Sequence, residues 1–141
     1  MVLNRQKKIR VATAALEEFL QRVQKETRTG GAEVTVCLVS DAEIARLNQE
    51  FRRKRGPTDV LSFPAEQRRR IAAYGGKVLG DIAIAPATAR RYAVKNGRKL
   101  HDELRILILH GVLHLQGHDH ETDHGQMDRI EKNLRRRLGL T

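Results

Sequence analysis

Segments with helical and strand-like hydrophobic spacing alternate along the whole chain. Five segments have the apolar spacing, caps or length that predict helices: residues 13–25, a segment capped by Ser40 or Asp41, and residues 86–96, 102–116 and 125–138. Four short segments rich in β-branched and apolar residues predict strands: residues 2–6, 33–40, 59–63 and 79–85. This alternation predicts a single α/β (α+β) domain over residues 1–141, with a small mixed sheet packed with helices. The polar stretch 65–76 is expected to be a mobile loop.

Length and composition narrow the class of protein. The chain has 141 residues, of which 40% are hydrophobic, and this suits one folded domain with one core. The longest apolar run, residues 106–109, is far shorter than the ~18 residues of a membrane span. We therefore expect no membrane association and, because no apolar leader is visible, a cytoplasmic location. The single cysteine, Cys37, excludes an internal disulfide and a multi-thiolate zinc site.

The net charge indicates a polyanionic partner. The chain carries 27 Lys and Arg against 17 Asp and Glu, a formal charge of +10. Basic runs at 52–55, 68–70 and 135–137 can contact an RNA backbone, which gives affinity with little sequence specificity. Only 4% of the residues are aromatic and tryptophan is absent, so phosphate contacts rather than base stacking are expected to dominate.

A cluster of histidines carries the clearest chemical signal. Five of the six histidines lie between His110 and His124. His110 and His114 are four residues apart and share one face of a helix, where both imidazoles can reach one ion. Gly117 can take the positive φ that ends the helix, and the turn can bring His118 or His120 to the same ion. Three imidazoles with no fourth protein ligand are typical of a catalytic zinc site.

The residue after the first histidine argues against a zinc peptidase. The spacing His-x3-His-x2-Gly-x2-His resembles that of metzincins, but zinc peptidases place a glutamate general base where this chain has Gly111. The proton acceptor must then come from elsewhere, with Asp59, Asp81 and Asp119 as candidates, or be zinc hydroxide itself. The alternative role of Asp59 is structural, in capping and strand-edge hydrogen bonds. Asp119 can equally hydrogen-bond a ligand imidazole and fix its orientation.

Four segments together resemble the YbeY family of bacterial rRNA maturation factors: residues 47–52, 57–64, 79–84 and the HGVLHLQGHDH motif at 110–120. The resemblance implies that His110, His114 and His120 bind one zinc ion per chain. It also implies a functional role for Arg52, which can clamp the scissile phosphate. The family usually has tyrosine where this chain has His118, so His118 is a possible additional or alternative ligand.

The resemblance also implies an activity and a set of partners. It implies a single-strand-specific, metal-dependent endoribonuclease that acts in 16S rRNA 3′-end maturation and ribosome quality control. The expected partners are small-subunit rRNA and the ribosome or its proteins, and the attacking group is either water or a 2′-OH. The alternative from another class is a non-catalytic ribosome-assembly factor with a structural zinc. The third hypothesis is a zinc peptidase, which Gly111 disfavours.

Overall fold

The computed structural model describes residues 1–65, 77–119 and 123–140. Within them the chain forms four strands and five helices in a nearly regular alternation: β1 (Val2–Asn4), α1 (Thr13–Glu26), β2 (Ala32–Leu38), α2 (Asp41–Arg52), β3 (Val60–Pro64), β4 (Lys77–Ile84), α3 (Pro86–Lys95), α4 (Leu100–Leu115) and α5 (Gln126–Arg137). All the predicted helices and strands are present, with ends that differ by at most two residues. The predicted loop lies outside the described residues except for Ala65.

The sheet is mixed, as the predicted class requires. Its strand order is β1-β2-β4-β3. Strands β1, β2 and β4 run parallel, whereas β3 pairs antiparallel with β4 and forms one edge. The predicted α/β fold with a small mixed sheet is therefore confirmed.

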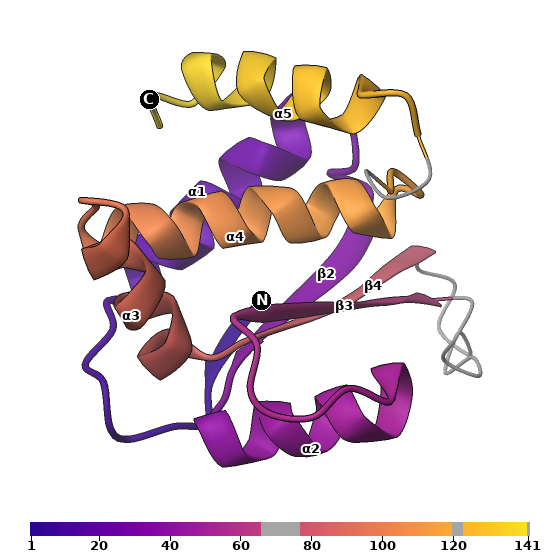
Figure 1. The fold of residues 1–141 in the computed structure, drawn as a ribbon. Helices are drawn as coiled ribbons and strands as arrows, with labels where there is room; N and C mark the ends of the chain where they lie inside the picture. Colours follow the sequence, from indigo (N-terminus) through magenta and orange to yellow (C-terminus); the bar gives the residue numbers. More distant parts are fainter. Residues whose placement is uncertain (66–76, 120–122, 141) are drawn as a thin grey trace.

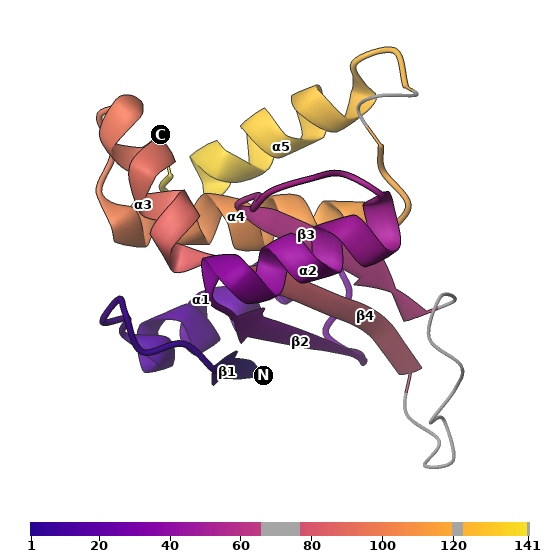
Figure 2. The ribbon, with the colours of Figure 1, turned by 60° about the horizontal axis from the view of Figure 1, so that its bottom comes forward.

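Helices cover both faces of the sheet (Figure 1). Because side chains alternate along a strand, Ile82 and Ile84 of β4 face the larger core with α1, α4 and α5. Ala83 faces the smaller core, where Ile44 of α2 is fully buried. Figure 2, viewed from below, shows α2 lying across this second face. The histidine helix α4 and the arginine-bearing helix α2 thus lie on opposite faces.

Helix α4 is apolar on nearly all sides because it is enclosed by the sheet and by other helices. It contacts α1, α3 and α5 as well as β3 and β4. Its end is defined by Gly117, which has φ +96°. The backbone N–H of His118 donates to the Leu113 carbonyl at 3.1 Å, and the backbone N–H of Gly117 donates to the His114 carbonyl at 2.9 Å. The predicted glycine turn after the second histidine is therefore confirmed.

Local hydrogen bonds define both ends of α2. The Ser40 hydroxyl accepts from the backbone N–H of Glu43 at 3.1 Å, so Ser40 is the N-cap. At the other end Arg53 takes a left-handed conformation. The amide of buried Asn48 then donates to the Gly56 carbonyl at 3.0 Å, which ties the basic segment 53–56 back to the helix.

In the part of the chain that the structure describes, no helix is both long and apolar enough to cross a membrane.

Candidate metal centre

His110 and His114 lie side by side on the last two turns of α4. Their Nε2 atoms are 2.9 Å apart, and the ring centroids are 4.5 Å apart at an interplanar angle of 71°. Both side chains are half-buried on a helix whose other faces are enclosed. The predicted pairing of the two imidazoles is thus present in the structure.

The pair fits two ligands of one metal ion. Two nitrogens bound to a tetrahedral zinc at ~2.0–2.1 Å lie about 3.3 Å apart, close to the separation of the two Nε2 atoms. Among residues 1–65, 77–119 and 123–140 no group of three His, Cys, Asp or Glu side chains is gathered around one point. The predicted third ligand, His120, lies outside the described residues. His118 and Asp119, the other candidates beyond Gly117, are half-buried.

A carboxylate on α5 engages the other ring nitrogen of His110. Glu131 Oε1 lies 2.7 Å from His110 Nδ1, and Arg135 donates to Glu131 Oε2 at 3.0 Å. Burial by itself raises the pKa of Glu131, but the hydrogen bond from His110 and the charges of His110 and Arg135 outweigh it. The pKa of Glu131 therefore lies below its ordinary value, and the carboxylate is ionised at neutral pH.

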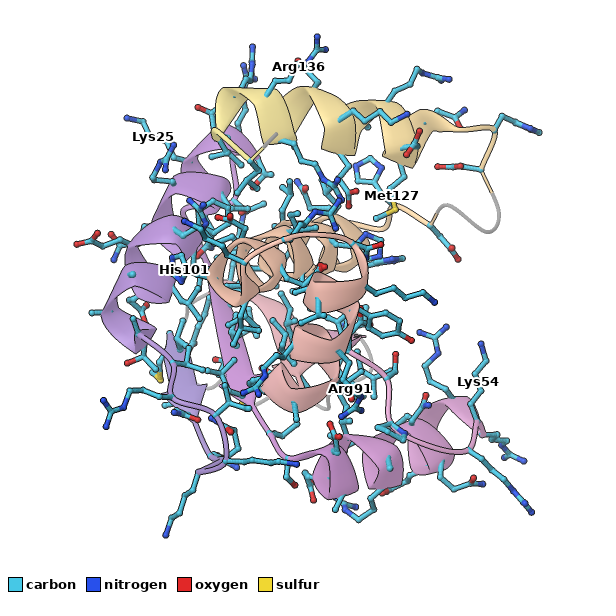
Figure 3. The ribbon with its side chains drawn as sticks, turned by 60° about the vertical axis from the view of Figure 1, so that its left-hand side comes forward. Lys25, Lys54, Arg91, His101, Met127 and Arg136 are labelled. Atoms are coloured by element: carbon cyan, nitrogen blue, oxygen red, sulfur yellow. The ribbon has the colours of Figure 1, made fainter. Side chains whose placement is uncertain are left out.

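The sequence reasoning missed Glu131. The spacing of residues in α5 could have identified it, because Glu131 lies on the same helix face as Met127 and Leu134, which are both buried. Figure 3 shows Met127 pointing from α5 toward α4, whereas Arg136 points away from the molecule. A carboxylate on the buried face of an amphipathic helix needs a partner inside the protein, and that partner is a predicted metal ligand.

Two cavities meet at His110. The first, of about 310 Å³, is lined by residues from α3, α4, α5 and the start of β3, including Asp59, Tyr92, Arg98 and Glu131. The second, of about 420 Å³, lies against the start of α5 and is lined by Asp123, Gly125, Met127, Asp128 and Glu131 as well as His110. His110 and Glu131 therefore line both cavities.

Of the three candidate proton acceptors, Asp59 lines a cavity with His110. Its backbone carbonyl also accepts from the N–H of Ala85 at 2.9 Å, which fixes its place before β3. Asp81 lies within β4, opposite Phe63 of β3. Asp119 follows the glycine turn, and its carbonyl accepts from the N–H of Asp123 at 3.1 Å.

Arg52 is not in contact with the histidine pair. It is the exposed last residue of α2, on the other face of the sheet. The neighbouring Phe51 packs its ring edge-on against Phe63 of β3, with centroids 5.2 Å apart. On the opposite face Ser62 of β3 donates to the Gly111 carbonyl at 3.5 Å. Arg52 and the histidines are thus separated by the edge strand β3.

The fold and the paired imidazoles define an α/β protein with a histidine pair arranged for metal binding. The sequence model of the family Endoribonuclease YbeY matches residues 1–139. An endoribonuclease YbeY of Solibacter usitatus is 48% identical over 126 residues, covering 89% of this chain and 79% of the relative. An endoribonuclease YbeY of Koribacter versatilis is 46% identical over 140 residues, covering 99% of this chain and 86% of the relative.

A solved structure shows the same fold. The solution structure of a Thermotoga maritima protein matches with a TM-score of 0.64 and 31% identity, covering 98% of this chain and 89% of that one. The chain belongs to the endoribonuclease YbeY family. The resemblance read from the motifs is confirmed, and with it the enzyme class, because the family is one of hydrolases acting on RNA.

Proposed function

We propose that this chain is a zinc-dependent endoribonuclease that cuts single-stranded RNA in 16S rRNA 3′-end maturation and ribosome quality control. His110, His114 and His120 are the proposed ligands of one zinc ion per chain. The observation that carries the proposal is the 2.9 Å approach of the His110 and His114 Nε2 atoms on the glycine-ended helix α4. Membership of an endoribonuclease family supplies the reaction class.

The chemistry of the site follows from its residues. His110, His114 and His120 would hold the zinc, which would supply Lewis-acid chemistry and the activation of water near neutral pH. Arg52 binds a backbone phosphate of the same RNA strand on the other side of β3 and so helps to hold the strand across the site. Asp59 lines the cavity beside His110, so we assign its carboxylate as acceptor of the proton released by the attacking hydroxyl.

The position of β3 supports a single-stranded substrate. Arg52 lies on one face of the sheet and the histidines on the other, and β3 between them is an edge strand. A flexible single strand can bend over this edge and contact both faces, whereas a stiff duplex cannot. Exposed Arg53, Lys54 and Arg55 extend the basic surface beside Arg52. We propose that the same surface docks on the small ribosomal subunit or its proteins in the cytoplasm.

The test compares matched variants on one substrate. Zinc-loaded wild type, His114→Ala, Arg52→Ala and Arg10→Ala are assayed on end-labelled single-stranded RNA and on the same RNA in a duplex. Arg10 is an exposed arginine before α1, so its variant controls for the loss of one positive charge. We expect Arg52→Ala to keep its zinc and lose about 10–100-fold in kcat/KM, the effect of one charged phosphate contact. His114→Ala should lose zinc and cleavage together, and Arg10→Ala should resemble the wild type.

Two outcomes would overturn the proposal. Cleavage that persists unchanged in His114→Ala comes from a contaminating nuclease or from another site. Purified wild type that contains zinc and binds small subunits, yet cuts no RNA, is an assembly factor with a structural metal. Elemental analysis of the same samples should find about one zinc per chain, which is lost in His110→Ala.

A further inference from the structure

Glu131 is a buried carboxylate with a separate partner for each oxygen. Its Oε1 lies 2.7 Å from His110 Nδ1, and its Oε2 accepts from Arg135 at 3.0 Å. The side chain is 12% exposed. The contact with His110 joins residues 21 positions apart in sequence, so packing of α5 on α4 is what creates it.

A second ion pair on the same helix shows what an ordinary surface pair looks like. Lys132 and Asp128 are also four residues apart and 3.1 Å from each other, but their side chains are 71% and 61% exposed. Such pairs contribute little to stability and need no burial. Glu131 instead loses hydration inside the protein, a cost that its hydrogen bonds to His110 and Arg135 must offset.

We infer that Glu131 is a positioning residue of the metal centre: by accepting a hydrogen bond from His110 Nδ1–H, it holds the imidazole in the tautomer and orientation that present Nε2 to the metal. This inference rests on the metal-binding part of the proposed function. A carboxylate behind a ligand imidazole fixes the proton on one ring nitrogen and leaves the lone pair of the other free for the ion. The unprotonated Nε2 of that tautomer is the atom that lies 2.9 Å from Nε2 of His114.

Arg135 completes the arrangement by holding the carboxylate itself. Its guanidinium lies one helical turn beyond Glu131 and is 25% exposed. Because the Oε2 contact restrains rotation of the carboxylate, Oε1 stays directed at His110. The carboxylate charge also makes the imidazole a more basic ligand.

The first arm of the test measures zinc affinity by competition with a chromophoric chelator, independently of RNA cleavage. We expect Glu131→Ala to weaken zinc binding about 10–100-fold. Glu131→Gln keeps an acceptor oxygen without the charge and should fall between Glu131→Ala and wild type. Glu50→Gln removes one negative charge from the exposed face of α2, on the other side of the sheet, and should stay within about twofold of wild type. Circular dichroism and urea midpoints verify that each variant is folded.

The second arm reads the tautomer directly in metal-free protein. Long-range ¹H–¹⁵N correlation of the imidazoles should show His110 protonated at Nδ1 in the wild type and in Glu50→Gln. In Glu131→Ala the proton should shift toward Nε2, the nitrogen favoured in a free neutral imidazole.

The two arms separate failure of the inference from failure of the proposed function. If Glu131→Ala binds zinc as tightly as wild type, or if His110 keeps the same tautomer in both, Glu131 does not position the ligand. If the wild type itself binds no zinc, the proposed metal function fails and the positioning of a ligand fails with it. If the tautomer of His110 still changes in Glu131→Ala in that case, Glu131 has only a structural role at the α4–α5 interface.

Discussion

Gly111 of α4 lies directly against the side chain of Ile82 of β4. A Cβ built on Gly111 would be 2.7 Å from Cδ1 and 2.9 Å from Cγ2 of Ile82. Position 111 is the one at which zinc peptidases carry their glutamate general base. In this fold the sheet occupies the space that such a side chain needs. The tertiary structure therefore adds a steric reason to the sequence argument against a peptidase.

Substitution of Gly111 should destabilise the protein. Gly111→Ala adds a methyl group to a filled interface, which costs ~1–3 kcal/mol and is partly offset by the ~1 kcal/mol helix preference of alanine over glycine. We expect a lower free energy of unfolding, measured by urea denaturation followed by circular dichroism. Ile82→Val removes the nearest atom, so Gly111→Ala should cost less in that background. Equal costs in both backgrounds would show that the contact with Ile82 does not limit position 111.

The link between α2 and α3 should make stability depend on pH in the acidic range. The Thr88 hydroxyl donates to Asp41 Oδ1 at 2.7 Å, and Arg91 donates to Oδ2 at 3.0 Å. Burial raises the pKa of Asp41, but the hydrogen bonds from Thr88 and Arg91 and the charge of Arg91 outweigh it, so the pKa is lowered. The stabilising contribution is therefore complete above the unfolded-state pKa of ~3.9 and is lost as pH falls through the lower folded-state value.

Asp41→Asn tests this link. Near neutral pH we expect the variant to be less stable by about 0.5–1.5 kcal/mol, the typical contribution of a hydrogen bond. The difference between wild type and variant should narrow below about pH 4, where the wild-type carboxylate becomes protonated. Urea midpoints of both proteins across this range provide the measurement. A difference that stays constant into strong acid would mean that the charge of Asp41 is not involved.

The basic segment after Arg52 should determine how strongly RNA binding depends on salt. Each phosphate contact to a single strand contributes about 0.7 to the slope of log K against log salt concentration. Replacing Arg53, Lys54 and Arg55 with alanine should lower that slope by up to about 2. The measurement is fluorescence anisotropy of labelled single-stranded RNA over a salt series. The control is a triple alanine variant at Lys7, Lys8 and Arg10, which are exposed residues before α1. It removes the same number of positive charges from another part of the surface. A similar change in this control would indicate binding by overall charge alone.

Zinc should stabilise the fold through the histidine pair. A ligand that binds only the native state at 1,000 times its Kd adds about 4 kcal/mol, which for a chain of this size corresponds to a rise in Tm on the order of 10 °C. A chelator should reverse the shift, and His110→Ala should abolish it. His101→Ala, at the opposite end of α4, should retain it. Loss of the shift in His101→Ala would show that zinc acts elsewhere on the helix.

The sequence by itself determined the features that depend on neighbouring residues. Helical spacing, the Ser40 cap and the glycine at 117 all act within a few residues, so the elements and the end of α4 could be predicted closely. The same locality explains why His110 and His114 could be paired in advance, because positions four apart share a helix face.

Tertiary structure alone decided the features that depend on packing between distant segments. Strand order β1-β2-β4-β3 brings together strands that are not consecutive, and no local pattern encodes it. Cys37 of β2 is half-buried and packs against the smaller core on the α2 side of the sheet. The contact of Glu131 with His110 likewise exists because the apolar face of α5 packs on α4. The sequence thus paired His110 with His114, and the packing of α5 on α4 brought the Glu131 carboxylate against His110.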